Sequence, residues 1–348
     1  MAYAPDRGVR IGAYDIESVN RDVIDRFLSR FSITLDDLAS QLAACPESWQ
    51  MLPMQDRPLL RAGDEVIVLD AKYLLERVTR GLYWLVHDYE RDNHGDGARN
   101  RWTQVYGDMI EFRAEDQMRR LAPPLIGQGS TFFTEEALRE AFQTKGNAQK
   151  NVDIGIDFGE EVVLAEVVSG QVSVPTRTQA DVGAFENDVE RLALKKIRQL
   201  DVSATNLLTD PQPPKSPLPN PARKIRPVVV HGGGFPVNVV TRRYIEEHTA
   251  QEGLLDDARV ERLSMIDMEE LDVCEALHDS HGLNLPEILG GWASSQYRNA
   301  SLRTYLAMRF EEQMEQMERT SELQRALDEA LAAIAARLGT EWHAPNGE

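Results

Sequence analysis

The chain is 348 residues long and 42% hydrophobic, so a sizeable core can be buried and wholesale disorder is not expected. Its formal charge of −19 argues against a protein that coats nucleic acid non-specifically, because phosphate binding relies on clustered lysine and arginine. No apolar run approaches the roughly 20 residues that cross a bilayer, and the N-terminus lacks the apolar core of a signal peptide. Two cysteines are too few for a disulfide framework. We therefore expect a cytoplasmic protein without a membrane partner.

The first third of the chain predicts helices on both sides of one β-hairpin. The elements expected there are two helices within 17–44, a hairpin at 58–69, a helix at 71–90, a loop at 91–100 and a helix at 101–121. Thr34 and Asp37 have the spacing of a capping box for the second helix. The loop at 91–100 has turn composition and predicts a domain boundary.

The middle of the chain contains its most strand-like segment. Residues 151–158 alternate in polarity, and residues 161–168 are β-branched and mostly apolar, which predicts a hairpin. The elements expected around it are a helix that Thr134 caps and that ends near 143, a helix at 182–203, a proline-rich spacer at 210–221, strands at 225–230 and near 259–266, a helix that Asp267 caps with Glu270, and a long helix at 299–338.

Two acidic residues fall on the predicted hairpin. Asp153 begins its first strand, and Glu166 lies near the end of the second, within a run of valine, leucine and alanine. A carboxylate in such a run is desolvated, which is costly unless a cation compensates it. Hydrolysis of a phosphodiester bond requires a divalent metal, an activated water and a cation near the phosphate. Magnesium prefers carboxylate ligands, so this pair is a candidate metal site.

The helix at 182–203 supplies a candidate cation. At roughly 100° per residue, Lys196 falls within the apolar stripe of Val189, Leu192 and Leu200, with Gln199 at its edge. An apolar stripe should face the sheet, so Lys196 is aimed inward. The alternative is a lysine whose stem packs against the core while its ammonium reaches solvent.

The stretch from Asp153 through Glu166-Val167-Val168-Ser169-Gly170 resembles the PD-(D/E)XK nuclease-like superfamily, which includes restriction endonucleases and Mrr-type enzymes. In that family an Asp on one strand and a Glu-x-Lys on the next bind metal and position the attacking water. The resemblance therefore implies that Asp153, Glu166 and the carbonyl of Val167 hold Mg²⁺ or Mn²⁺. Val168 stands where the family lysine is expected, which puts catalysis in doubt.

Some branches of the family carry this lysine on the following helix, and Lys196 fits that position. A glutamine on the same helix recurs in Mrr-like branches, so the resemblance adds Gln199 to the catalytic set. Gly107-x-x-Ile110-Glu111 resembles the first core helix, whose Glu sometimes joins the metal site. Glu111, and Lys195 beside Lys196, are therefore additional candidates.

The resemblance also implies the fold and its subdivision. We expect an α/β protein with a restriction-endonuclease-like mixed central sheet flanked by helices, and with helical additions at both ends. The expected regions are an N-terminal accessory region at 1–97, a nuclease-like core at 98–282 and a C-terminal helical region at 283–348.

Two segments suggest partners. Residues 191–226 carry eight basic residues against Asp201 and Asp210, a local balance of +6, which predicts a nucleic-acid contact. The resemblance implies DNA more than RNA as the nucleic acid. The alternative is a solvated helix followed by an ordinary linker. Near the C-terminus an a/d-like apolar series, Leu327, Leu331, Ile334 and Leu338, indicates either packing on its own domain or a homo-oligomer contact.

Three functions compete on this basis. The first is a metal-dependent nuclease that hydrolyses phosphodiester bonds, with a defence or DNA-processing role suggested by the family. The second is a degenerate nuclease fold that binds nucleic acid or a protein partner without cleaving it, because Val168 replaced the lysine. The third is an assembly protein that uses its helical ends. The position of the Lys196 ammonium relative to Asp153 and Glu166 separates the first two.

Overall fold

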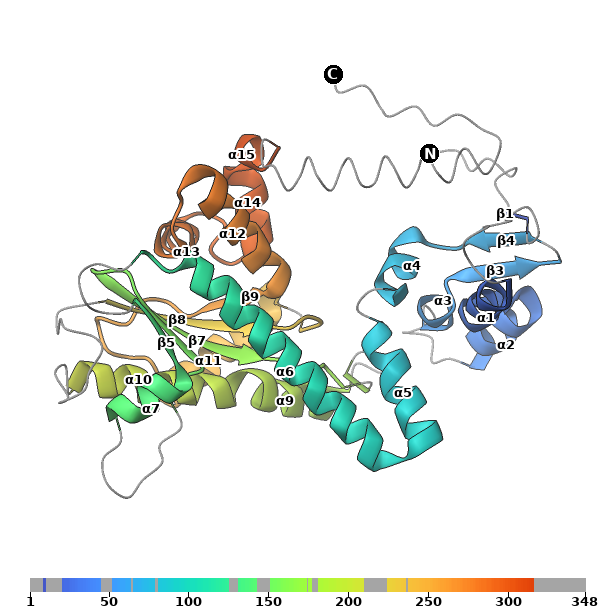
Figure 1. The fold of residues 1–348 in the computed structure, drawn as a ribbon, viewed down its shortest axis with the longest axis horizontal. Helices are drawn as coiled ribbons and strands as arrows, with labels where there is room; N and C mark the ends of the chain where they lie inside the picture. The colour runs from blue at the N-terminus through green and yellow to red at the C-terminus, as the bar shows by residue number, and fades with distance from the viewer. Residues whose placement is uncertain are drawn as a thin grey trace. The chain divides into compact units, whose positions relative to one another are not determined.

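The computed structural model describes residues 9–10, 21–44, 52–63, 65–78, 81–124, 131–142, 151–173, 175–176, 181–209, 224–235 and 237–315. Among these residues the chain forms two compact units, a smaller one up to Trp102 and a larger one from Thr103 onward. Each unit has its own sheet (Figure 1) and its own hydrophobic core. The division falls within one helix, near the boundary predicted at residue 97.

The smaller unit is built on a four-stranded sheet with the order β1-β4-β3-β2. Its elements are β1 (Val9–Arg10), α1 (Arg21–Phe31), β2 (Ser32–Thr34), α2 (Leu35–Ala44), α3 (Leu52–Asp56), β3 (Leu59–Ala62), β4 (Glu65–Val68), α4 (Ala71–Val78) and α5 (Leu82–His94). The antiparallel pairing of β3 with β4 confirms the predicted hairpin. Phe31, Leu59 and Val66 form the centre of its core. The Asp37 amide donates to the Thr34 hydroxyl at 3.2 Å, as the capping spacing predicts.

Two predictions for this region are wrong. The helix expected at 71–90 is divided, because α4 ends at Val78 and α5 begins at Leu82. The loop expected at 91–100 is almost entirely helical, because α5 continues to His94 and α6 spans Asp96–Leu121. A single residue, Gly95, makes the turn with φ of 78°, and its amide donates to the Arg91 carbonyl. The turn-forming composition therefore marks two helix ends that meet at one glycine.

The larger unit contains a five-stranded mixed sheet with the order β5-β6-β7-β8-β9 (Figure 1). After α6, its elements are β5 (Phe132–Thr134), α7 (Glu135–Phe142), β6 (Ile154–Asp157), β7 (Glu161–Val168), α9 (Val182–Val189), a π-helical turn (Glu190–Leu194), α10 (Lys195–Thr209), β8 (Lys224–His231), α11 (Val239–Gln251), β9 (Ser264–Asp267), α12 (Met268–His281), α13 (Leu285–Ser294), α14 (Leu302–Arg309) and α15 (Glu311–Glu315). β5, β6 and β7 are antiparallel neighbours, whereas β7, β8 and β9 run parallel. The α/β class is confirmed.

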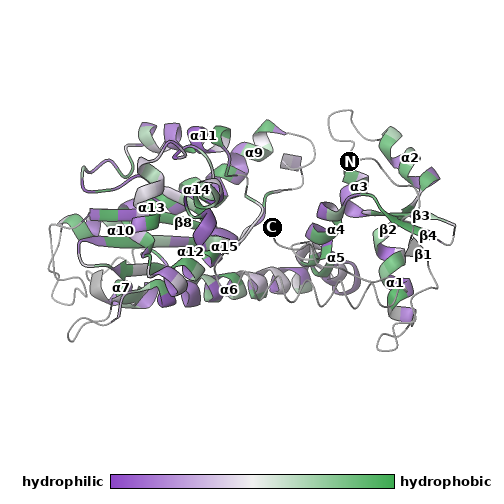
Figure 2. Ribbon diagram, turned by 90° about the horizontal axis from the view of Figure 1, so that it is seen from above, coloured by the Kyte–Doolittle hydropathy of each residue, from purple (hydrophilic) through white to green (hydrophobic). Residues whose placement is uncertain are grey.

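Helices cover both faces of this sheet. Val163, Ala165 and Val167 of β7 pack on one face in a cluster that includes α6, α12, α13 and α14. Leu164 and Val168, which alternate with them, pack on the opposite face with α7, α10 and α11. Along α6, where hydrophilic and hydrophobic residues follow one another (Figure 2), the buried residues after Ala98 are Ala114, Gln117, Met118 and Leu121, all in its C-terminal half. Because β7 and β8 are central, nearly all of their side chains are buried.

In this unit the sequence predicts two helix caps correctly but misses one strand and one helix. Thr134 accepts a hydrogen bond from the Ala137 amide, and Asp267 forms a complete capping box with Glu270, as predicted. Strand β5 and helix α11 were not predicted. β5 has only three residues, and the inward face of α11 is mixed, with Thr241 and Arg242 buried beside Ile245.

The long helix expected at 299–338 is wrong in its described part. Helix α14 ends at Arg309, and Phe310 leaves the helical conformation with φ of −126° and ψ of 26°. This turn packs the Phe310 ring edge-on against Tyr305, with ring centroids 5.8 Å apart, so tertiary packing outweighs helical propensity here. Helices α13 and α14 share the core of the larger unit. The series from Leu327 to Leu338 lies outside the described residues. No described helix is both long and apolar enough to cross a membrane.

Candidate functional site

Asp153 and Glu166 are brought together by the β6–β7 hairpin. The antiparallel register pairs Ile154 with Ala165, so Asp153, directly before β6, lies beside Glu166. Glu166 alternates with residues that face α6 and therefore points to the opposite side of the sheet, toward α10. Its side chain is 0% exposed, whereas that of Asp153 is 28% exposed. One acid is thus fully desolvated and the other reaches solvent.

Lys196 of α10 lies between these two carboxylates. Its Nζ is 2.6 Å from Glu166 Oε2 and 3.5 Å from Asp153 Oδ2. The lysine side chain is 22% exposed, so its ammonium does not reach away into open solvent. The structure therefore brings together the two acids of the hairpin and the inward lysine of the following helix.

A π-helical turn at Glu190–Leu194 immediately precedes α10. Such turns contain an extra residue and recur at functional sites. After the turn, Ile197 and Leu200 are fully buried and Lys196 lies at the edge of their face, while Lys195 is exposed. The turn sets which face of α10 meets the sheet, and Lys195 is not part of the site.

Backbone groups of β7 complete the arrangement. The Val167 amide donates to Asp153 Oδ2 at 2.7 Å, which holds that carboxylate against the end of β7. The amide and carbonyl of one strand residue point to the same edge, so the Val167 carbonyl faces the side on which Asp153 lies. Gln199, one turn after Lys196, is partly buried, but among the described residues no hydrogen bond joins it to Asp153, Glu166 or Lys196.

The electrostatics of this cluster are those of a site with excess negative charge. Burial, together with the charge of Asp153, raises the pKa of Glu166 to about 8, although Lys196 opposes the shift. Burial lowers the pKa of the Lys196 ammonium, but Glu166 and Asp153 outweigh that effect and the net shift is upward. Glu166 Oε1 is buried and receives no hydrogen bond from any described residue. A buried carboxylate oxygen without a hydrogen-bond donor is energetically unfavourable, and a bound cation would stabilise it.

Glu111 of α6 belongs to the same electrostatic environment. Burial raises its pKa, the nearby charge of Asp153 raises it further, and Lys196 lowers it. At Gly107 of α6 there is little space for a side chain, because a Cβ there would lie 3.1 Å from the hydroxyl oxygen of Ser169, which follows β7. The helix thus passes β7 closely, one turn before Glu111.

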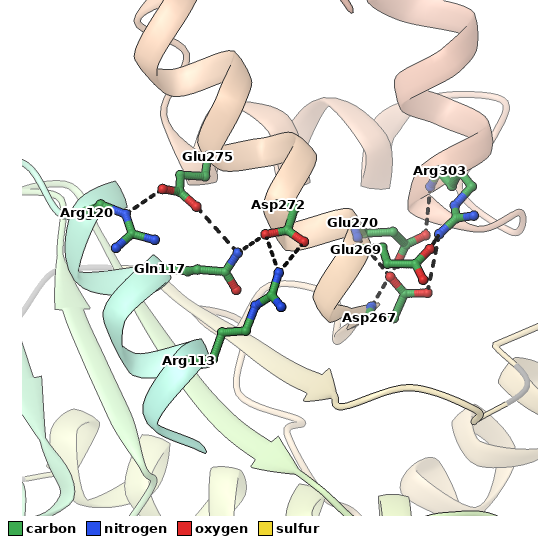
Figure 3. Close-up of polar contacts among 9 residues, drawn as sticks. All are labelled: Arg113, Gln117, Arg120, Asp267, Glu269, Glu270, Asp272, Glu275 and Arg303. Atoms are coloured by element: carbon green, nitrogen blue, oxygen red, sulfur yellow. Dashed lines mark hydrogen bonds and ion pairs between the residues drawn. The ribbon is translucent and has the colours of Figure 1, made fainter. Parts of the chain in front are cut away.

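A polar seam between α6 and α12 anchors the helix that carries Glu111 (Figure 3). The Arg113 guanidinium donates to both carboxylate oxygens of Asp272, at 3.0 and 2.8 Å. Gln117, buried in the seam, donates to Asp272 and to Glu275, and Arg120 pairs with Glu275. The Glu275 side chain is only 2% exposed, so a buried ion pair fixes α6 against α12.

A second polar cluster binds α14 to the beginning of α12 (Figure 3). The Arg303 amide donates to Glu270 Oε1 at 2.7 Å, and its guanidinium pairs with Glu269. Glu270 also accepts from the Asp267 amide in the capping box. This cluster satisfies the end of a helix and is structural.

The basic region at 191–226 is largely neutralised in three dimensions. Of its six described cations, five form ion pairs: Arg191 with Asp188, Lys196 with Glu166, Arg198 with Glu190 and Glu252, Lys224 with Glu261, and Arg226 with Glu161. Lys215 and Arg223 lie outside the described residues. The local excess of positive charge counted along the sequence is therefore reduced by acids that come mostly from other elements.

Two buried polar residues near the site were not predicted. His231, the last residue of β8, pairs with Val168 and shares the sheet face of Glu166. Burial lowers its pKa to about 3, neither ring nitrogen is hydrogen-bonded to a described residue, and the ring stacks on Phe235. Asp188 accepts hydrogen bonds from Ser173 and from other groups of the segment that connects β7 to α9. The one sequence feature that could have pointed to His231 is its position between a strand and three glycines.

The donor set fits a hard divalent cation. Two carboxylates, the Val167 carbonyl and the nearby Glu111 are oxygen donors of the kind that Mg²⁺ and Mn²⁺ prefer, and Glu166 Oε1 is buried without a partner. No three His, Cys, Asp or Glu side chains among the described residues are gathered closely enough to form a complete metal cage. Magnesium commonly binds one or two carboxylates and takes its other ligands from water and substrate phosphate, so a complete cage is not required.

Comparison with known proteins adds no family assignment, since no family model matches the chain and no curated protein matches it significantly.

Proposed function

We propose that the larger unit hydrolyses phosphodiester bonds of nucleic acid, with DNA as the favoured substrate and Mg²⁺ or Mn²⁺ as its cofactor. The observation that carries the proposal is the position of the Lys196 ammonium, 2.6 Å from Glu166 and 3.5 Å from Asp153. Two acids on an antiparallel strand pair and an amine from the next helix meet at one place. This arrangement supports a restriction-endonuclease-like core in which the family lysine has moved to α10.

Each residue has a distinct role in this proposal. Asp153, Glu166 and the Val167 carbonyl would hold the cation, which supplies Lewis-acid activation of the phosphate and of a water molecule. Asp153 is fixed by the Val167 amide, and Glu166 by the Lys196 ammonium. Lys196 orients the attacking water and balances negative charge that develops on the phosphate oxygens. The charges of Asp153 and Lys196 act on Glu111, which is a candidate for a further oxygen ligand.

A second function, binding without cleavage, is favoured by one observation. The Lys196 ammonium already pairs with both carboxylates, so a divalent cation has to compete with it for Glu166 Oε2. With Val168 buried in the core instead of a lysine, a site that never exchanges this ammonium for metal would be inert.

The test is cleavage of plasmid DNA, single-stranded DNA and RNA by the full chain, with and without Mg²⁺ or Mn²⁺. Glu166→Ala and Lys196→Met should each reduce metal-dependent cleavage by about 100-fold or more, as expected for loss of an electrostatic catalytic group. Lys195→Met is the matched control, because Lys195 is its exposed neighbour, and should cleave like the unaltered chain. Cleavage that survives Glu166→Ala would remove the proposal.

A calorimetric Mn²⁺ titration separates the two functions. Binding that Glu166→Ala abolishes, accompanied by cleavage, supports the nuclease. Nucleic-acid binding by a chain that neither binds Mn²⁺ through Glu166 nor cleaves any of the three substrates supports the inert module.

A further inference from the structure

Three arginines from separate segments of the larger unit meet beside β9, the strand at the edge of its sheet. Arg242 lies in the first turns of α11, Arg262 comes two residues before β9, and Arg298 lies between α13 and α14. The guanidinium groups of Arg242 and Arg262 both donate to the Arg298 carbonyl oxygen, at 3.0 and 2.9 Å. Two positive side chains therefore share one neutral acceptor.

Arg242 is buried without an acid of its own. It is 6% exposed, its guanidinium lies 4.4 Å from the centre of the Trp292 ring, and no described residue forms an ion pair with it. Its Nη2 is buried and has no hydrogen-bond partner among the described residues. Burial and the charge of Arg262 lower the pKa of Arg242 to about 10, although Glu246 and Glu270 oppose this shift. A buried guanidinium beside a second one is costly unless an anion compensates it.

The acids around these arginines do not balance them. Glu246 pairs with Arg262, which also donates to Asn299, and Glu270 already accepts hydrogen bonds from two backbone amides. The Arg298 side chain is exposed, and its guanidinium has no ion pair with any residue that the structure describes. Three cations therefore stand against two acids, within a chain whose total charge is −19.

We propose that Arg242, Arg262 and Arg298 form a binding site for a phosphate group that belongs to the backbone of a nucleic acid. The nucleic acid as the source of the phosphate rests on the proposed function, whereas the phosphate site itself does not. The forked guanidinium matches the oxygens of a phosphate, and stacking on Trp292 holds Arg242 in place for it. A phosphate here supplies the negative charge that the shared carbonyl cannot.

The sheet places this site within reach of a nucleic acid held at Glu166. The strand register aligns Glu166 with Val229 of β8 and with Met265 of β9, and Arg262 precedes Met265 by three residues. With about 4.8 Å between strands and about 3.3 Å per residue, the arginines lie roughly 10–15 Å from Glu166 along the sheet. One DNA strand carries a phosphate about every 3.4 Å of helix axis, so three or four nucleotides span this distance.

The site is tested by NMR of the arginine guanidinium groups in the full chain, without divalent metal. Inorganic phosphate, titrated at constant ionic strength, should shift the Nε–Hε signals of Arg242 and Arg262, and a short DNA duplex should shift the same signals. Acetate at equal concentration is the control for a general anion effect. Glu166→Ala should leave all these shifts unchanged, because the site does not include the proposed metal ligands.

Substitutions test the site through the affinity for a labelled duplex, measured by fluorescence anisotropy. Arg298→Gln should weaken binding about tenfold and make the salt dependence shallower by about one unit of slope, as expected when one phosphate contact is lost. Arg243→Gln is the matched control, since it removes the same charge from an exposed arginine of α11 that pairs with Glu247. Glu246→Gln should strengthen binding, because it removes an acid from beside the site.

Signal shifts with both phosphate and duplex, together with opposite effects of Arg298→Gln and Glu246→Gln on affinity, support the proposal. Shifts with inorganic phosphate but none with duplex would overturn the nucleic-acid backbone as the source of the phosphate. Equal shifts with acetate, or no shift with either phosphate ligand, would overturn the site. None of these measurements depends on cleavage, so a chain that cleaves nothing yet shows these shifts would lose the proposed function and keep this site.

Discussion

Glu166 has two different carboxylate oxygens. Oε2 accepts a hydrogen bond from the Lys196 ammonium, whereas Oε1 is buried without a partner among the described residues. Burial and the neighbouring charge of Asp153 raise its pKa to about 8, so below that pH the carboxyl group retains a proton. A cation bound at this place has to displace that proton, because metal ligands bind in their deprotonated form.

Metal affinity should therefore rise with pH up to about 8, by about tenfold per pH unit, the slope expected when one proton is released. Mn²⁺ titrations at several pH values, in two buffers of different ionisation enthalpy, measure both the affinity and the released proton. Glu166→Gln should bind more weakly and lose this part of the pH dependence. A pH-independent affinity would show that the proton is not held at Glu166.

His231 predicts an acid sensitivity of the fold. Burial lowers its pKa to about 3 in the folded chain, against 6.5 for the free group, so only the unfolded chain takes up a proton between these values. Its contribution to stability is complete above pH 6.5 and is lost as the pH falls toward 3. One proton corresponds to about 1.4 kcal/mol per pH unit.

Urea denaturation between pH 6.5 and 5, above the range in which most carboxylates titrate, measures this slope. Glu166, whose carboxyl group keeps its proton in the folded chain throughout this range, contributes a slope of opposite sign. His231→Phe should therefore lower the slope by about 1.4 kcal/mol per pH unit relative to the unaltered chain, and His281→Phe, at the exposed end of α12, should not change it. Equal slopes in all three proteins would contradict the assignment to His231.

At the scale of elements, the site depends on how α6 and α10 are held on the two faces of one sheet. Helix α10 is positioned by the π-helical turn and by the apolar residues that follow it. Helix α6 is positioned by the close passage at Gly107 and by the seam with α12. The seam contains Glu275, whose side chain is 2% exposed and whose main cation is Arg120.

Arg120→Ala should lower the free energy of unfolding by about 2 kcal/mol, because it removes the guanidinium that pairs with a buried carboxylate. This value is at the low end for buried pairs, since the Arg120 side chain is itself 44% exposed. Arg139→Ala removes an exposed pair with Glu135 and should leave stability almost unchanged. Denaturant titration compares the two, and equal losses would show that the seam is not a special contact.

The difference between local patterns and contacts between elements explains what the sequence could and could not predict. The β6–β7 hairpin and the inward face of Lys196 were predictable because alternation and helical spacing are local patterns. The one-residue turn at Gly95 was read as a loop because glycine, asparagine and aspartate also end helices. The break at Phe310 depends on a ring contact with Tyr305, and the partners of Arg198 and Lys224 include Glu252 and Glu261 of other segments. Such contacts are long-range and leave no periodic signal.

At the scale of the whole molecule, charge governs how a nucleic acid could approach. The chain carries −19 overall, and five of the six described cations in the region 191–226 are bound to acids. Few of the described cations in this region are then left to displace counterions from a phosphate backbone. A nucleic acid should therefore be held at few phosphates and mainly through the metal site.

Binding to DNA should accordingly depend only weakly on salt. Two or three phosphate contacts give a slope of about −2 to −3 in a plot of log affinity against log salt concentration. Fluorescence anisotropy with a labelled duplex over a range of KCl concentrations measures it, with Mg²⁺ held constant and Ca²⁺ tested in its place. A slope as steep as about −6 would reveal a broad basic surface that the ion pairs do not neutralise.

The π-helical turn at Glu190–Leu194 has a genetic consequence. A single-codon deletion there would close the turn into an ordinary α-helix and rotate one flank by about 100° relative to the other. Asp188 on the near side holds Ser173 and Thr176, and Lys196 on the far side holds Glu166. After such a deletion at most one of the two flanks could keep its partners. Removing one residue from the turn would therefore disable the site without changing any residue in it.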